Sequence, residues 1–217
     1  MNEDQEFLKE ENETYYGVKE KIIKMGNQFY SRGWLYATSG NLSSVINMDP
    51  VQLVITASGV NKGDMSVSDI IEVDSQGNGI NTELKPSAET LLHLTVVRET
   101  GAKAVIHTHS IWATILSRKF SGKGYMKISG YEMLKGLDSV KTHEAEEIIP
   151  IFENSQNMTF LSGKIGNYLA TNPAVHGFLL SGHGLYTWGK SMESAARNLE
   201  ALEFILEIKG RSLSSGL

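Results

Sequence analysis

The stretch KAVIHTHSIWATILSR, residues 103–118, places two histidines inside an apolar run. The β-branched residues before them favour a buried strand, and the spacing after Ser110 is typical of a helix. Along a strand, residues i and i+2 point to the same side, so His107 and His109 share one face while Thr108 and Ser110 share the other. Two buried imidazoles without partners would be costly, so this pair favours a metal site over two core histidines.

A third ligand is expected at His183, which lies between Gly182 and Gly184 in LLSGHGLYTWG. Glycines on both sides of a polar residue let the backbone come close to a ligand, although a histidine in a surface turn would have the same spacing. Three protein ligands with an open fourth position are typical of a catalytic zinc site. The chain has no cysteine, so any metal must use His, Asp or Glu. The other histidines, His93, His143 and His176, are interpreted as structural or surface residues.

The order of predicted elements indicates an α/β fold. Segments with helical spacing alternate with β-branched runs, so we expect a sheet covered by helices on both sides. No repeat, linker or compositional break divides the chain, and residues 14–217 are expected to form a single domain after a frayed, acidic segment 1–13. Helices are predicted over residues 14–32, 85–101, 111–119, 159–170 and 191–209, and strands over 53–59, 70–79, 104–110, 146–152 and 177–189.

The charge balance limits the classes of partner. The formal net charge is −5, and a general nucleic-acid binder usually shows a basic face, so no nucleic-acid partner is expected. No apolar stretch approaches the length of a membrane span, and the N-terminal MNEDQEFLKEENE is acidic rather than basic and then apolar. We therefore expect a cytoplasmic protein without a signal peptide or a membrane partner. An anionic substrate would have to be held by local cations or backbone amides.

Two loops rich in Ser, Thr and Gly, residues 36–44 and 56–64, are candidates for an anion site, together with the helix start at Ser87. Backbone amides at glycine turns and at helix N-termini bind anions. Each loop alone is most often a simple turn, but three of them beside a metal motif favour a phosphate pocket. The expected contributors are Ser39, Gly40, Asn41, Ser58, Gly59, Lys62 and Ser87, with Lys85 and Lys135 as further cations.

Two carboxylates are candidates for proton transfer. Glu89 lies in the first turn of its predicted helix, where the helix dipole alone would favour an acidic residue. Glu132 lies between apolar residues, where partial burial would raise its pKa toward the range useful in proton transfer. The alternative for Glu132 is a surface salt bridge.

Taken together and in this order, the motifs TSGNLS, TASG, KPSAET, HTHS and GHG resemble the class II aldolase family, from about Tyr15 to Lys209. The resemblance implies a three-layer αβα sandwich around a mixed, mostly antiparallel sheet, usually assembled as a homotetramer. It also implies a metal-dependent lyase that acts on a sugar phosphate through an enediolate. On this resemblance His107, His109 and His183 would hold one Zn²⁺ per subunit, and no organic cofactor is expected.

Within the family, the chain is most similar to the branch that dehydrates a methylthio-substituted pentulose 1-phosphate in methionine salvage. The stretches that carry this resemblance are GWLYATSGNLS, TASGVNKG, LKPSAETLLH, VIHTHSIWATILS, GYEMLKGL and GHGLYTWG. That branch implies Glu132 as the acid/base and a substrate-positioning role for Glu89, whereas the sugar-phosphate aldolases imply Glu89 as the acid/base. Three alternative functions remain open. Two are other enzymes of this family, an aldolase acting on fuculose or rhamnulose 1-phosphate and a pentulose-phosphate 4-epimerase, and the third is a metal-free interaction domain.

Overall fold

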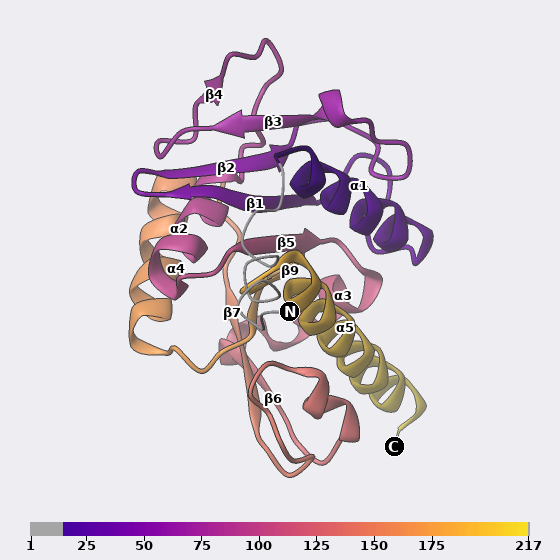
Figure 1. Ribbon diagram of the computed structural model, residues 1–217. Helices are drawn as coiled ribbons and strands as arrows, with labels where there is room; N and C mark the ends of the chain where they lie inside the picture. Colours follow the sequence, from indigo (N-terminus) through magenta and orange to yellow (C-terminus); the bar gives the residue numbers. More distant parts are fainter. Residues whose placement is uncertain (1–14, 217) are drawn as a thin grey trace, which may run out of the picture.

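The computed structural model describes residues 15–216, and the segment 1–13 that was expected to fray lies outside the described residues (Figure 1). In the described part of the chain, nine strands form one sheet in the order β4-β3-β2-β1-β5-β9-β8-β7-β6. Neighbouring strands are antiparallel except for the parallel pair β7 and β8. The mixed, mostly antiparallel sheet is thus confirmed. The strands are β1 Asn41–Met48, β2 Val51–Thr56, β3 Ile70–Val73, β4 Gly79–Ile80, β5 Ala104–Thr108, β6 Tyr125–Ile128, β7 Glu147–Phe152, β8 Gly177–Leu180 and β9 Gly184–Gly189.

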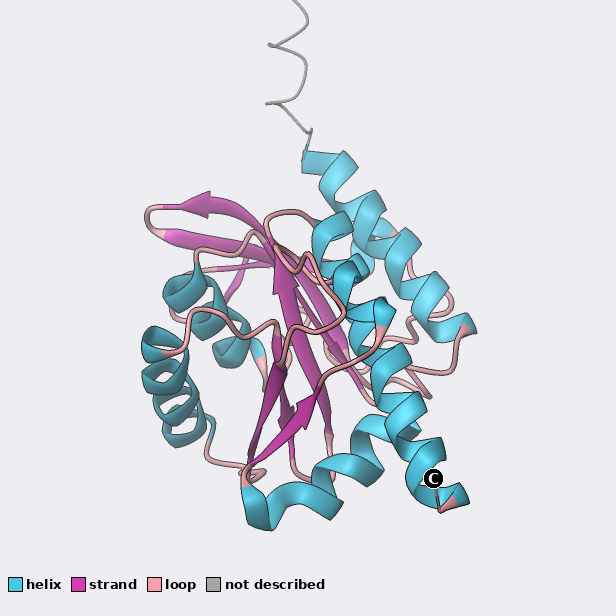
Figure 2. Cartoon of the chain, turned by 90° about the horizontal axis from the view of Figure 1, so that it is seen from below, coloured by secondary structure: helices cyan, strands magenta, loops and turns pink. Residues whose placement is uncertain are grey.

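Helices cover both faces of the sheet, which confirms the three-layer arrangement (Figure 2). One core cluster joins the sheet to α1, α3 and α5, and a second joins the opposite face to α2 and α4. Within residues 15–216, no helix combines the length and the apolar character needed to cross a membrane. The helices are α1 Tyr15–Ser31, α2 Thr90–Thr100, α3 Ile111–Phe120, α4 Met158–Thr171 and α5 Met192–Ser215, with short 3₁₀ turns η3 Val67–Asp69, η4 Ser121–Lys123 and η5 Glu132–Gly136.

The alternation predicted for the histidine strand is present in β5. Ile106 packs in the cluster with α1, α3 and α5, whereas Val105 packs in the cluster with α2 and α4. His107 follows the parity of Val105, so its ring lies on the α2 side of the sheet. The chain then turns directly into α3, whose first turn is capped by Ser110 accepting a hydrogen bond from the Ala113 amide (3.1 Å).

Two predicted boundaries were wrong. The helix predicted over 85–101 begins only at Thr90, because the Ser87 side chain accepts a hydrogen bond from the Glu89 amide and forms a turn there. The loop predicted over 36–44 instead leads into β1, a strand in the middle of the sheet. Its inward residues Asn41 and Ser43 are buried but polar, so the apolar alternation that identifies a strand is missing.

Close approach of β9 to β5 requires glycine at position 184. A Cβ built there would lie 2.0 Å from the carbonyl oxygen of Thr108, a backbone atom that cannot rotate away. We expect Gly184→Ala to lower the free energy of unfolding by about 1–3 kcal/mol through overpacking. The measurement is urea unfolding.

The matched control is Gly163→Ala in α4, where a Cβ would meet no atom within 4 Å. This change should be neutral or slightly stabilising, because alanine loses less backbone entropy in a helix. Equal midpoints for the two variants would contradict the close approach of β5 and β9.

Candidate active site

Three imidazoles converge at the end of the central strands. His107 lies in β5, His109 follows directly after it, and His183 lies in the turn between β8 and β9. Because β5 and β9 are antiparallel neighbours, the end of one strand and the start of the other meet. The Nε2 atom of His109 lies 2.8 Å from that of His107 and 3.0 Å from that of His183, and the remaining Nε2 pair is 3.3 Å apart. The structure therefore brings the three predicted ligands together.

The Nε2 atoms of the three rings face one another. The Nδ1 of His107 lies 3.0 Å from the carbonyl oxygen of Leu185, which can only accept, so Nδ1 donates this hydrogen bond and Nε2 faces the other two rings. The same ring stacks on Tyr186, with centroids 3.9 Å apart. Burial, followed by the neighbouring His107 and His183, lowers the pKa of His109 to about 3, so this ring is neutral at neutral pH.

Glu89 supplies a fourth donor atom. Its Oε1 lies 3.1 Å from Nε2 of His183 and 3.5 Å from Nε2 of His107, and the four donor atoms lie within 4.8 Å of one another. Burial would raise the pKa of Glu89, but the charges and hydrogen bonds of His107 and His183 outweigh burial and hold the pKa below its ordinary value. Nitrogen lone pairs aimed at one point repel one another, and a divalent cation removes that repulsion. The donor set thus fits a divalent metal such as zinc.

A buried hydrogen-bond network orients Glu89. Asn41 donates from Nδ2 to Oε2 of Glu89 (2.8 Å) and to Oγ of Ser87 (3.0 Å). The Oδ1 of Asn41 bonds Nε2 of His93, and Nδ1 of His93 bonds the Ser43 hydroxyl (2.7 Å). Burial, and then the charge of His107, lowers the pKa of His93 to about 3. His93 is therefore neutral, with Nε2 donating to Asn41 and Nδ1 accepting from Ser43.

The interpretation of His93 as an ordinary structural or surface residue missed this link to the site. Its position four residues after Glu89 on one helix was the available signal, because residues i and i+4 share a helix face. That signal could not identify Asn41 and Ser43 as its partners, since they come from β1, a strand that the sequence pattern did not predict.

A cavity of about 140 Å³ adjoins Glu89 and His109. Lys62 is buried in its wall and donates to the carbonyl oxygens of Thr38 (2.9 Å) and Val60 (2.8 Å). Burial lowers the pKa of Lys62 to about 8. The Ser39 hydroxyl is buried and has no hydrogen-bond partner among the described residues. All seven residues predicted for the phosphate pocket line this cavity: Ser39, Gly40, Asn41, Ser58, Gly59, Lys62 and Ser87. Neither of the two further lysines, Lys85 and Lys135, is among its lining residues.

The prediction of a partly buried Glu132 with a raised pKa was wrong. Glu132 begins η5 with its side chain 70% exposed, forms an ion pair with Lys135 and lies 3.6 Å from Nδ1 of His143. The hydrogen bond and charge of Lys135 lower the pKa of Glu132. The structure thus agrees with the surface salt bridge that was the alternative.

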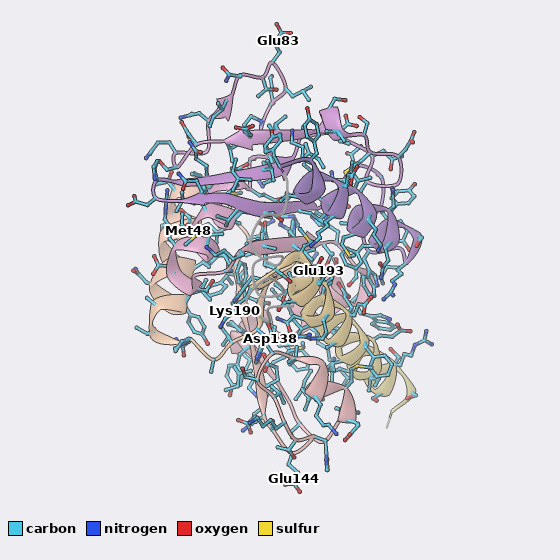
Figure 3. The ribbon with its side chains drawn as sticks, viewed as in Figure 1. Met48, Glu83, Asp138, Glu144, Lys190 and Glu193 are labelled. Atoms are coloured by element: carbon cyan, nitrogen blue, oxygen red, sulfur yellow. The ribbon has the colours of Figure 1, made fainter. Side chains whose placement is uncertain are left out.

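Glu132 also lies at the other end of the sheet from the histidine cluster of its own chain. β6 pairs with β7 so that Ile128 lies beside Glu147, at the end where the parallel strand β8 begins. His176, just before β8, bonds the carbonyl of Asp138 (2.7 Å) and ties the segment after η5 to that end. His183 follows the opposite end of β8. Figure 3 shows Glu144 at the tip of the molecule that carries β6.

Replacement of His93 should destabilise the protein. His93→Phe keeps a ring but leaves Asn41 Oδ1 and the Ser43 hydroxyl without their partner, so we expect a loss of about 1–3 kcal/mol in the free energy of unfolding. Chemical unfolding measures it, with His143→Phe on the surface as the control, expected within about 0.5 kcal/mol of wild type. Two equally stable variants would contradict the network.

Comparisons with known proteins agree with this geometry. Residues 20–209 match the family model of the class II aldolase and adducin N-terminal domain. Methylthioribulose-1-phosphate dehydratase of Marinobacter nauticus is 40% identical over 196 residues, which cover 89% of this chain and 92% of the relative. The enzyme of the same name from Pseudomonas paraeruginosa is 40% identical over 204 residues, covering 94% and 98%. The structure of L-fuculose-1-phosphate aldolase from Thermus thermophilus aligns with a TM-score of 0.71 at 24% identity, covering 92% of this chain and 96% of that one, and supports the fold. The chain therefore belongs to the class II aldolase family.

Proposed function

We propose that the chain removes water from 5-methylthioribulose 1-phosphate to give 2,3-diketo-5-methylthiopentyl 1-phosphate, a hydro-lyase step of methionine salvage in the cytoplasm. Similarity to two dehydratases across nine-tenths of the chain supports this substrate. The observation that carries the proposal is the position of the histidine cluster directly beside a cavity lined by hydroxyls, glycines and a buried lysine. Such a pair of sites fits a ketose 1-phosphate, in which the carbonyl carbon is bonded to the carbon that carries the phosphate ester.

We assign one Zn²⁺ to His107, His109 and His183. When bound, the ion would act as a Lewis acid that polarises the ketone and stabilises negative charge next to it. The chain itself supplies a neutral imidazole at His109, and the hydrogen bond from His107 to Leu185 fixes the orientation of a second ring. A cluster arranged in this way argues against the alternative of a metal-free interaction domain.

The cavity would hold the 1-phosphate. The Ser39 hydroxyl is free to donate, and Lys62 has one ammonium hydrogen beyond its two carbonyl bonds. Glu89 and His109 also line the cavity, so a phosphate bound there places the reacting carbons next to the cluster. Binding of this remote group fixes the orientation of the reacting end.

Dehydration needs a base at C3 and an acid at the C4 hydroxyl. We propose that Glu132 of a neighbouring copy removes the C3 proton and returns it to the departing hydroxyl, which leaves as water. The enol then tautomerises to the 2,3-diketone. Glu89, oriented by Asn41, positions the substrate. Because Glu132 is exposed in its own chain, at the other end of the sheet from the histidine cluster, this role for Glu132 would be filled between subunits.

Exposed apolar side chains support a homo-oligomer, for which we propose a tetramer. Met133, next to Glu132, is 37% exposed, and Ile111, two residues after the ligand His109, is 55% exposed. Apolar side chains exposed beside both the metal ligands and Glu132 fit two surfaces that meet in an assembly. Such contact would bring Glu132 of one copy to the cluster of another.

An aldolase that cleaves a sugar phosphate is the second candidate. It is favoured by one observation, that Glu89 is the carboxylate at the cluster within the same chain. In such an enzyme, or in a 4-epimerase of this family, Glu89 would carry the proton and Glu132 would be dispensable.

The first test is an assay of zinc-loaded protein with 5-methylthioribulose 1-phosphate. We expect the diketone, and we expect chelation or His107→Ala to lower the rate below about 1% of wild type, since metal catalysis supplies several kcal/mol. Added Zn²⁺ should restore the chelated wild-type protein but not the variant. A three-carbon phosphate product would instead identify an aldolase and give the catalytic role to Glu89.

The second test is complementation between subunits. Glu132→Gln should lower the rate by about 100-fold or more, the contribution of a positioned acid or base. Glu89→Gln should lower it by a similar factor, because the substrate is then held in the wrong orientation. Co-expression of the two variants should restore about a quarter of the wild-type rate, because one site in four then combines both intact carboxylates. A mixture as inactive as its parents would place both carboxylates in one chain, and an active Glu132→Gln homo-oligomer would exclude Glu132 as the acid/base.

A further inference from the structure

Glu203 is a buried carboxyl that the proposed reaction does not use. It lies in α5, only 3% exposed, on the face of the sheet opposite the metal cluster. Its Oε1 accepts a hydrogen bond from the Thr108 hydroxyl at 2.8 Å. Burial raises the pKa of Glu203 to about 7, although hydrogen bonds from Ser110 and Thr108 act in the opposite direction. A carboxyl in this position is costly, and an apolar side chain would pack there at lower cost.

The two hydroxyls that bind Glu203 alternate with the metal ligands along the chain. Thr108 separates His107 from His109, and Ser110 follows them. Since alternate residues of an extended segment point to opposite faces, the imidazoles face the cluster while both hydroxyls face α5. Thr108 and Ser110 are also buried, so water does not replace Glu203 as their partner. The carboxyl of Glu203 therefore binds the face of segment 107–110 that is opposite to His107 and His109.

The third proposed ligand, His183, is connected to Ser110 through hydrogen bonds of Thr114. Ser110 caps α3 by accepting from the Ala113 amide, and its carbonyl oxygen accepts from the Thr114 hydroxyl (2.9 Å). That hydroxyl also lies 3.1 Å from the carbonyl oxygen of His183. A shift of Ser110 would thus move the first turn of α3 and, through Thr114, the turn that carries His183.

We propose that Glu203 is a positioning residue that holds the Nε2 atoms of His107, His109 and His183 at their metal-binding separation, acting through Thr108 and Ser110. The inference rests on the metal-binding part of the proposed function and is independent of the substrate. Groups behind the ligands commonly contribute in this way, and their loss typically weakens metal binding by about 10- to 100-fold.

The test measures metal binding without substrate, so a failure of the dehydratase assay does not affect it. The dissociation constant for Zn²⁺ is obtained by competition with a chelator, and the ligand geometry from the visible absorption of the Co²⁺-loaded protein. Glu203→Met, which keeps the length of the side chain but removes both acceptors, should weaken Zn²⁺ binding by about 10- to 100-fold and shift the Co²⁺ bands. Glu203→Gln, which retains one acceptor oxygen, should recover most of the affinity.

Three further variants separate positioning from packing. Thr108→Val removes the donor and should reproduce the loss, and the double variant Glu203→Met with Thr108→Val should bind no more weakly than the worse single variant, because both remove one interaction. Glu207→Gln, one turn later in α5 and paired with Arg211 on the surface, is the matched control and should bind Zn²⁺ as wild type does. The unfolding midpoint of each metal-free protein shows that it is folded.

Wild-type affinity and an unchanged Co²⁺ spectrum in folded Glu203→Met would overturn the inference. Additive losses in the double variant would also overturn it, since they would mean that Glu203 and Thr108 act separately. If Glu203→Met does not fold, Thr108→Val decides: a normal Zn²⁺ affinity in that variant rejects the positioning role, and a weakened affinity supports it.

Discussion

The site depends on the pairing of β5 with β1 on one side and with β9 on the other. This register places His107 opposite Asn41 of β1 and opposite Tyr186 of β9. A proposed metal ligand, the residue that orients Glu89 and the ring stacked on that ligand therefore lie in one row across three strands. The pairing is close because Gly184 lets β9 approach the backbone of Thr108. A shift of one residue in β5 would turn both hydroxyls toward the cluster and the imidazoles toward α5.

Burial and hydrogen bonding together set the electrostatics of this row. Burial keeps His93 and His109 neutral, and neutral imidazoles can serve as hydrogen-bond partners and metal ligands. Glu89 stays ionised because the histidines beside it outweigh the cost of its burial. The charge balance of the cluster therefore favours a cation, while Lys62 and Ser39 in the adjoining cavity favour an anion. A substrate whose ketone lies next to its phosphate ester satisfies both.

The opposite side of β5 has a different chemistry. The hydroxyls of Thr108 and Ser110 form hydrogen bonds with the carboxyl of Glu203. This polar group lies beside the apolar cluster between the sheet and α5. Because the side chains alternate along this segment, the imidazoles lie on one face and the hydroxyls of Thr108 and Ser110 lie on the other. This arrangement explains why the segment HTHS contains no apolar residue although His107, Thr108 and Ser110 are buried.

The sequence alone determined the layered α/β fold and the shared face of His107 and His109, because strand alternation and helical spacing are local and act within a few residues. His183 was expected from its flanking glycines and the family resemblance, and the pairing of β5 with β9 brings it to the other two. The sequence also predicted the residues that line the cavity beside the histidine cluster, since turns rich in glycine and hydroxyl residues have local signatures. It did not determine β1, whose inward residues are polar, or the role of His93, whose partners are about 50 positions away. The exposure of Glu132 and the burial of Glu203 were likewise decided only by tertiary structure. Whether a carboxyl is buried depends on strands and helices distant in sequence, and no local pattern records that packing.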